Sequence, residues 1–156
     1  MSLRDAIIRA FDKKKTREKR DEHGNWKYPM YWLIDLHDVI IPGTYTRNNE
    51  GKKFYPGAEE VLNWLTVRGN MCIILWTSSH VDSVKDIVFW FAEHKIGFNY
   101  INSNPEVESN EILNTSMKPY FDLLLDDKAG FNGETDWILI KQTLIDIGEW
   151  DKKWRH

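Results

Sequence analysis

Three apolar segments of this chain each end in side chains that can bind a metal ion or a phosphate group. The polar residues at these ends are Asp35, Thr77, Ser78, Asp126 and Asp127. If the segments are neighbouring strands of a parallel sheet, their carboxyl ends meet at one edge, where open α/β sheets bind ligands. Carboxylates are hard oxygen ligands of the kind that Mg²⁺ prefers, and hydroxyls donate hydrogen bonds to phosphate oxygens. We therefore predict a joint site for a divalent cation and a phosphate.

Lys118 is a further candidate for phosphate binding. It precedes Pro119, whose fixed φ angle stiffens the chain before the third of these segments. A lysine there could offer a positive charge to the phosphate. Taken alone, each signal has an ordinary structural explanation: Thr-Ser-Ser is typical of a helix cap, paired acids of a turn, and a single lysine of a solvated surface. The prediction depends on the combination.

Strand-like and helix-like segments alternate along the sequence. Apolar runs predict strands, and apolar residues at helical spacing predict helices. We expect strands at 31–36, 71–76, 98–102 and 120–125, and helices at 3–20, 56–69, 79–95 and 135–147. Ser79, with Asp82 three residues later, predicts a capping box at the third helix. The alternation predicts an α/β fold with a doubly wound, mostly parallel sheet and flanking helices.

The 156 residues are enough for one α/β domain, which we place at 29–156, preceded by an N-terminal helical extension at 1–28. The extension contains a basic segment, Lys13–Arg20. That segment could contact a phosphate backbone such as that of a nucleic acid, or could simply be the solvated end of a helix. Turn-forming residues between Asp38 and Tyr55 predict a small hairpin or flap beside the site in place of a large cap.

Composition excludes several classes of protein. The formal net charge of -3 provides no overall attraction to nucleic acid or to an anionic membrane. The single cysteine, Cys72, excludes an internal disulfide and a cysteine-based zinc site, and its apolar surroundings predict a buried thiol. The chain has no signal-peptide pattern and no apolar run of the ~20 residues that span a bilayer. We therefore expect a cytoplasmic protein without a membrane partner; the oligomeric state stays open.

The ordered motifs resemble those of the haloacid dehalogenase (HAD) superfamily of phosphohydrolases, in particular its small capless members. The resemblance covers residues 31–133 and rests on Asp35-Leu36-His37-Asp38, Thr77, Lys118, and the pair Asp126-Asp127. It implies a Mg²⁺-dependent phosphatase acting on a phosphorylated small molecule or polymer end. Asp35 is then the nucleophile that forms an aspartyl-phosphate.

The same resemblance implies the remaining roles at the site. Asp35, Asp126, Asp127 and the backbone carbonyl of His37 are expected to hold the ion. Thr77 and Lys118 are expected to hold the phosphate, and Ser78 is a further candidate for that role.

His37 departs from the family pattern, which has an aspartic acid two residues after the nucleophile to protonate the leaving group. Imidazolium can also donate a proton, so His37 could be the general acid; Asp38 is another candidate. Alternatively, the replacement marks a catalytically impaired binding protein that keeps the metal and phosphate sites. A different reaction at the same nucleophile is the least favoured alternative, because no further residue indicates it.

Overall fold

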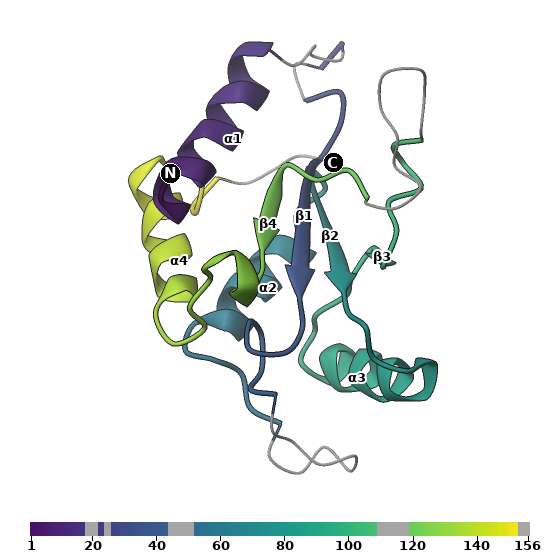
Figure 1. Cartoon of the computed structure of the whole chain (residues 1–156). Coiled ribbons are helices and arrows are strands. Elements are labelled where there is room, and N and C mark those ends of the chain that lie inside the picture. Colours follow the sequence, from purple (N-terminus) through teal and green to yellow (C-terminus); the bar gives the residue numbers. More distant parts are fainter. Residues whose placement is uncertain (18–21, 24–25, 44–51, 109–118, 153–156) are drawn as a thin grey trace.

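The polypeptide folds into a four-stranded parallel sheet packed with α-helices (Figure 1). The computed structural model describes residues 1–17, 22–23, 26–43, 52–108 and 119–152. In chain order the elements are α1 (Leu3–Arg17), β1 (Met30–Asp35), α2 (Ala58–Thr66), β2 (Met71–Trp76), α3 (Val81–Glu93), β3 (Tyr100–Ile101), β4 (Leu123–Leu125), the 3-10 helix η1 (Asp127–Ala129) and α4 (Asp136–Asp146). The predicted α/β class with a parallel sheet is confirmed.

The strands lie in the order β3-β2-β1-β4, and every pair is parallel. In the register, Asp35 lies opposite Trp76 of β2, and Ile34 lies opposite Leu125 of β4. All four strands therefore end at one edge, which is the lower edge in Figure 1. The residues that follow β1, β2 and β4 meet there because neighbouring strands are ~4.8 Å apart.

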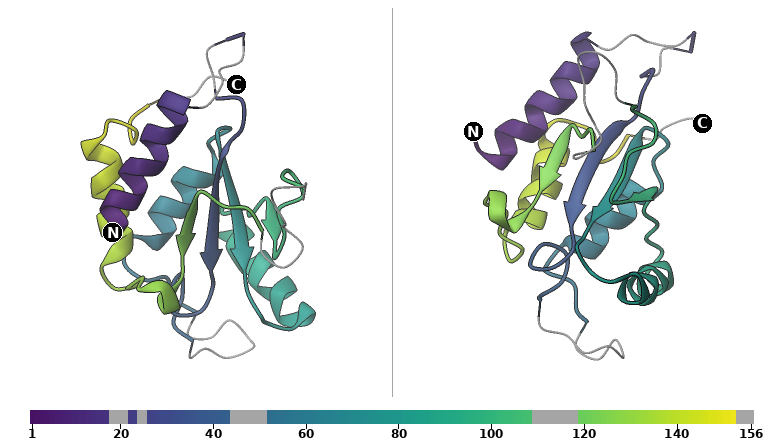
Figure 2. Two further views of the ribbon diagram at one scale, coloured as in Figure 1. Left: turned by 45° about the horizontal axis from the view of Figure 1, so that its top comes forward. Right: turned by 45° about the vertical axis from the view of Figure 1, so that its right-hand side comes forward.

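Side chains of the central strands alternate between two apolar clusters, because successive strand residues point to opposite faces. Trp32 and Ile34 belong to the larger cluster, to which α1, α2, α3 and α4 all contribute buried residues. Tyr31 and Leu33 belong to a smaller cluster, against which side chains of β3, β4 and the connection between them pack. Among the described residues, no helix contributes to this second cluster. Figure 2 shows α2 and α4 behind the sheet and α1 beside β4.

Cys72 lies in the second cluster, as expected for a buried thiol, with 2% of its surface exposed. The thiol donates to the Glu106 carboxylate at 3.7 Å, and Tyr31 donates its hydroxyl to the same carboxylate at 3.2 Å. Burial, followed by the charge of Glu106, raises the pKa of the Cys72 thiol to about 12. The thiol is therefore protonated at neutral pH and is a poor nucleophile.

Several predicted boundaries differ from the structure by one to three residues, and two of the differences have identifiable reasons. Ser79 does not cap α3: the N-cap residue is His80, and no side chain caps the helix. The Thr77 hydroxyl instead accepts the backbone N–H of Ser79 at 3.2 Å, and His80 is extended, with φ -63° and ψ 153°, so the helix begins at Val81. Strand β4 begins only at Leu123, because the Asp122 carboxylate accepts the N–H of Tyr31 at 2.8 Å and takes the place of a backbone partner.

Other expected segments lie partly or wholly outside the described residues. The first helix was expected to continue to residue 20; its described part ends at Arg17. Residues 44–51, which hold most of the expected flap, lie outside the described residues, as does Lys118. The third expected strand, at 98–102, lies within the described residues and is reduced to Tyr100–Ile101.

The loop after β1 is held in place by α4. The indole N–H of Trp137, which is fully buried, donates to the backbone carbonyl of Val39 at 2.7 Å. A buried carbonyl that loses its donor costs about 1–3 kcal/mol. This hydrogen bond therefore fixes the backbone that carries His37 and Asp38.

We expect Trp137→Phe to lower the free energy of unfolding by about 2–3 kcal/mol, measured in urea, because the Val39 carbonyl is left without a partner. Trp64→Phe is the matched control. The Trp64 indole donates to the Trp150 carbonyl, which also accepts Arg68 and so keeps a donor, and we expect a loss of only about 1 kcal/mol. Equal losses in the two variants would show that ring packing, and not the hydrogen bond, holds the loop.

Candidate functional site

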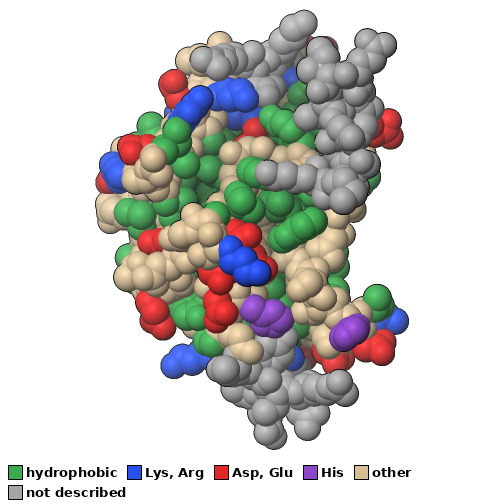
Figure 3. Space-filling model, in the orientation of Figure 1, with side chains coloured by type: hydrophobic (Ala, Val, Ile, Leu, Met, Phe, Trp, Pro, Cys, Tyr) green, Lys and Arg blue, Asp and Glu red, His purple; other side chains and the backbone are tan. Residues whose placement is uncertain are grey.

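Three carboxylates meet at the carboxyl edge of the sheet. Asp35 is the last residue of β1, Asp126 directly follows β4, and Asp127 is the first residue of η1. One oxygen from each lies within 4.8 Å of the others, and all three side chains are half-buried. Figure 3 shows acidic side chains gathered around a basic one, with a histidine close by, on this face of the molecule. A divalent cation fits this donor set of hard oxygens on three side chains.

The turn after β4 fixes the direction of the Asp126 and Asp127 carboxylates. The Oδ1 atom of Asp126 accepts the backbone N–H of Lys128 at 2.9 Å, and its carbonyl accepts the N–H of Phe131 at 3.1 Å. Gly130 makes this turn possible because its φ of 100° lies in the left-handed region, which side chains disfavour. The pair is thus presented by a hydrogen-bonded turn and not by a freely moving loop.

Burial and the neighbouring acids disfavour the charge on Asp35. Desolvation, then a hydrogen bond with Asp127, and further the negative charges of Asp126 and Asp127 raise the pKa of the Asp35 carboxyl to about 7. The backbone N–H of Leu36 donates to Asp35 at 2.9 Å and opposes this shift. Three carboxylates this close repel one another, and a bound cation removes that cost. The raised pKa is therefore the electrostatic mark of a site suited to a metal ion.

His37 and Asp38 lie in the tight loop that follows β1. His37 is half-buried and its backbone forms a bridge with Ile41. Asp38 has a φ of 61°, its N–H donates to the Ile41 carbonyl at 2.7 Å, and its Oδ1 accepts the N–H of Gly43 at 3.0 Å. Asp38 therefore has a structural task in closing the loop. The expected roles of His37, as proton donor and as carbonyl ligand, stay predictions.

Tyr55 also lies at the site, although no pattern in the sequence indicates this. Burial, then the charge of Asp38, raises the pKa of its phenol, and Asp127 contributes to the same shift. The Tyr55 ring fills the space next to Gly133, where an added Cβ would lie 2.5 Å from a ring carbon. Only glycine at position 133 lets the ring occupy this place between the loop after β1 and the turn after β4.

Thr77 lies beside Asp35, because it follows Trp76, the register partner of Asp35. It is buried, with 7% of its surface exposed, whereas Ser78 is exposed. The Thr77 hydroxyl donates to the Ser79 hydroxyl at 3.0 Å. The structure thus brings Thr77 to the same edge as the three acids, and the phosphate-binding roles of Thr77 and Ser78 stay predictions.

Asn102 holds Thr77 through both atoms of its side-chain amide. Its Oδ1 accepts the Thr77 N–H at 2.7 Å, and its Nδ2 donates to the Thr77 carbonyl at 2.8 Å. Asn102 has a φ of 57°, a left-handed conformation that asparagine tolerates better than most residues. Sequence analysis identified Asn102 only as a strand end.

The two hydrogen bonds from Asn102 to Thr77, together with the left-handed backbone at Asn102, predict that Asn102→Ala is less stable than Asn102→Gly. Asn102→Gly removes two hydrogen bonds but tolerates the left-handed backbone, and we expect it to lose about 1–2 kcal/mol of unfolding free energy. Asn102→Ala adds the strain of a Cβ at positive φ, about 1 kcal/mol more. Urea unfolding of both variants gives the comparison. Equal midpoints for the two would show that the backbone relaxes out of the left-handed region.

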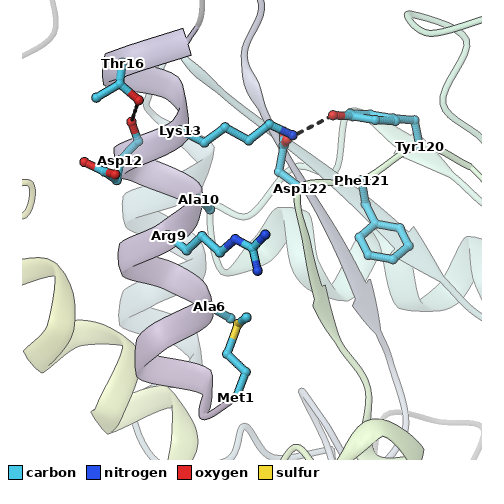
Figure 4. Close-up of a pocket in the computed structure, with 10 residues that line it drawn as sticks. All are labelled: Met1, Ala6, Arg9, Ala10, Asp12, Lys13, Thr16, Tyr120, Phe121 and Asp122. Carbon is cyan, nitrogen blue, oxygen red and sulfur yellow. Dashed lines mark hydrogen bonds between the residues drawn. The ribbon is translucent and has the colours of Figure 1, made fainter.

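The basic segment of α1 is partly used for folding. The Lys14 amine is 4% exposed and lies 3.8 Å from the Asp122 carboxylate, and Lys15 pairs with the buried Glu149 at 3.1 Å. Arg9 and Lys13 point into a hollow of about 360 Å³ between α1 and Tyr120–Asp122 (Figure 4). This hollow lies before the start of β4, at the opposite end of the sheet from the three acids. Nucleic-acid binding through this segment stays untested.

Comparison with known proteins identifies the fold but no activity. No family model and no curated protein matches the sequence. A solved structure described as a conserved protein coded by a locus from Bacteroides thetaiotaomicron is similar, with a TM-score of 0.57 and 20% sequence identity. The similarity covers 80% of this chain and 99% of that chain. No helix among the described residues is both long enough and apolar enough to cross a membrane.

Proposed function

We propose that this protein is a Mg²⁺-dependent phosphohydrolase of the HAD type that acts on a phosphomonoester through an aspartyl-phosphate. The observation that carries the proposal is the meeting of Asp35, Asp126 and Asp127 within 4.8 Å at the carboxyl edge of a parallel sheet. The motif resemblance arises from sequence order, whereas this proximity arises from the fold. The sequence motifs and the folded geometry both select Asp35, Asp126 and Asp127, and Thr77 lies at the end of the strand next to Asp35.

The reaction begins at the Asp35 carboxylate. One of its oxygens attacks phosphorus in line, the bond to the ester oxygen breaks, and the His37 imidazolium gives a proton to the departing oxygen. Water then attacks phosphorus and gives a proton to the now neutral His37, the bond to Asp35 breaks, and inorganic phosphate leaves. In this proposal Ser78 donates a hydrogen bond to the phosphate oxygens, Thr77 does so once its hydroxyl turns away from Ser79, and Lys118 supplies a positive charge.

The ion-binding residues are Asp35, Asp126, Asp127 and the backbone carbonyl of His37. A Mg²⁺ ion held by these residues would draw negative charge from the phosphate oxygens and so favour attack by an anionic nucleophile. Binding also keeps Asp35 ionised against the repulsion that raises its pKa in the free protein.

A generic aryl phosphate tests the proposal against its alternative. We expect purified protein to release 4-nitrophenol from 4-nitrophenyl phosphate with MgCl₂ and to stop when EDTA is added. The replacement of the usual acid by His37 favours one alternative, a binding protein without turnover. That alternative predicts no product, together with a rise in Tm when Mg²⁺ is added. Absence of both turnover and Mg²⁺ binding would refute the two proposals together.

A pH–rate profile tests the part assigned to His37. If its imidazolium donates the proton, His37→Asn lowers the activity and changes the shape of the pH–rate profile. The effect should be larger for phenyl phosphate than for 4-nitrophenyl phosphate, because the weaker leaving group needs the proton more. An unchanged profile in the variant would assign the proton to another donor.

A further inference from the structure

Helix α3 carries a row of exposed apolar side chains that the core does not use. Val81 and Phe89 are 72% and 71% exposed, and Val88 is 39% exposed. The face of α3 that meets the core is formed instead by Ile87, Trp90 and Phe91. Val81, Val88 and Phe89 therefore point away from the core. Exposed aromatic and aliphatic residues in a row are unusual for a monomer surface and mark binding sites.

This apolar face forms one wall of a groove of about 800 Å³. Val84 and Lys85 of α3 line the same wall, and Ile101 of the edge strand β3 lines the other. Lys85 is the one charged residue among those that line the groove. Sites that bind organic ligands are typically of this size and are lined mainly by apolar side chains with a few polar groups.

The groove adjoins the candidate phosphate site. Two of its lining residues, Ser79 and Asn102, are hydrogen-bonded to Thr77, the first through its hydroxyl and the second through both amide atoms. Helix α3 lies on the side of the sheet where the strands end, beyond the tip of β2 (Figure 1). From Val81 to Val88 the helix rises ~10 Å, enough to contact an apolar group of several carbon atoms.

We propose that this groove binds an apolar organic group of the phosphomonoester substrate, so that the preferred substrate carries an alkyl or aryl moiety and not a highly charged one. The inference rests on the proposed function, because the groove is assigned by its continuity with Thr77. The phosphate lies at the strand ends, and the apolar group extends from it between α3 and Ile101. The described residues form no large cap over the site. Apolar contact in the groove therefore selects the substrate in place of a cap.

A series of 4-alkylphenyl phosphates isolates the groove from the chemistry. The alkyl group hardly changes the acidity of the leaving phenol, so a change in kcat/KM reports binding of the chain. We expect kcat/KM to rise about twofold for each added methylene from phenyl to 4-butylphenyl phosphate, less than the ~4-fold of complete burial. A flat series with clear turnover of phenyl phosphate would overturn the groove and leave the phosphatase proposal intact.

Two valines of nearly equal exposure give a matched pair of variants. Val81 lines the groove, whereas Val67, at 71% exposure, lies at the end of α2 outside it. We expect Val81→Ser to reduce the preference for 4-butylphenyl over phenyl phosphate at least threefold, with phenyl phosphate changed less than twofold. Val67→Ser should leave both unchanged. Equal loss in both variants would assign the effect to general destabilisation and overturn the proposal.

A binding measurement keeps the groove testable if the protein has no turnover. Calorimetry in the presence of MgCl₂ measures the affinities of methyl-, butyl- and hexylphosphonic acid for the wild-type protein and for Val81→Ser. Tighter binding of the longer acids by wild type only, without turnover, supports the groove and refutes the phosphatase. Equal affinity for all three overturns the groove. Concentration-dependent dimerisation that Val81→Ser abolishes, with no chain-length effect, would show that a second copy covers this face instead.

Discussion

Asp35→Asn is expected to abolish turnover and, at the same time, to stabilise the metal-free protein. Loss of the carboxylate removes the proposed nucleophile, and we expect kcat to fall at least about 1,000-fold. The same change removes a negative charge from a cluster in which burial and the two neighbouring acids raise the pKa of Asp35 to about 7. An amide of nearly the same shape carries no charge and avoids the repulsion.

The sign of the stability effect follows from the direction of the shift. Because the pKa of Asp35 in the folded state lies above its ordinary value of 3.8, the unfolded chain ionises first as pH rises. Stability attributable to this carboxyl is complete below about pH 4 and is lost progressively as pH rises to about 7. Above pH 7 the folded protein carries the full electrostatic penalty, which is absent from the Asp35→Asn variant.

Thermal unfolding in EDTA at two pH values measures the effect. At pH 8 we expect Asp35→Asn to unfold ~2–4 °C above wild type, corresponding to about 1 kcal/mol once solvent screening of a half-exposed group is allowed for. At pH 4 the two proteins should unfold together. Asp12→Asn, at an exposed position of α1, is the control and should match wild type at both pH values. A variant less stable than wild type at pH 8 would contradict the assigned origin of the raised pKa.

The part of the site that could be predicted from the sequence consists of the residues at the ends of strands. An apolar run that delivers an acid to its end is visible in sequence, and parallel pairing then brings Asp35, Asp126 and Asp127 together. Helix and strand periodicity was sufficient for this step because it needs only the order of elements and the common direction of the strands. The second strand was predicted with its observed bounds, Met71–Trp76.

Contacts between residues distant in sequence were not predictable in the same way. Asn102 holds Thr77 across 25 positions, and Trp137 holds Val39 across 98. Neither residue type signals such a partner, because asparagine at a strand end and tryptophan in a helix have common structural roles. Tyr55 could have been suspected only once Asp38 and Gly133 were known to face it.

Helix α3 illustrates how periodicity can identify a helix without orienting it. Its apolar residues are numerous enough for two faces, so the pattern does not determine which face meets the core. The structure buries Ile87 and Phe91 and leaves Val88 and Phe89 exposed. On the core side of the helix, Trp90 stacks on Phe54 with ring centroids 4.5 Å apart, and residues of the exposed side line the apolar groove.

Magnesium binding is expected to depend strongly on pH because the ion must displace a proton from Asp35. With a pKa of about 7 in the metal-free protein, Asp35 is about nine-tenths protonated at pH 6 and about one-tenth at pH 8. Metal ligands have to be deprotonated, so each ion bound at pH 6 releases close to one proton. The apparent Kd for Mg²⁺ should therefore be about tenfold weaker at pH 6 than at pH 8.

Calorimetry with MgCl₂ at both pH values, repeated in two buffers of different ionisation enthalpy, gives the affinity and the number of protons released. At pH 8, EDTA treatment should lower the Tm, and saturating Mg²⁺ should restore it. Asp127→Asn is the informative variant: it removes one acid and a hydrogen-bond partner of Asp35, so the pKa of Asp35 falls toward its ordinary range. Its Mg²⁺ affinity should be weaker overall and should change less between the two pH values than that of wild type, because burial and Asp126 still act on Asp35. Binding by the wild-type protein that does not change with pH would place the ion away from Asp35 and would remove the electrostatic basis of the proposed active site.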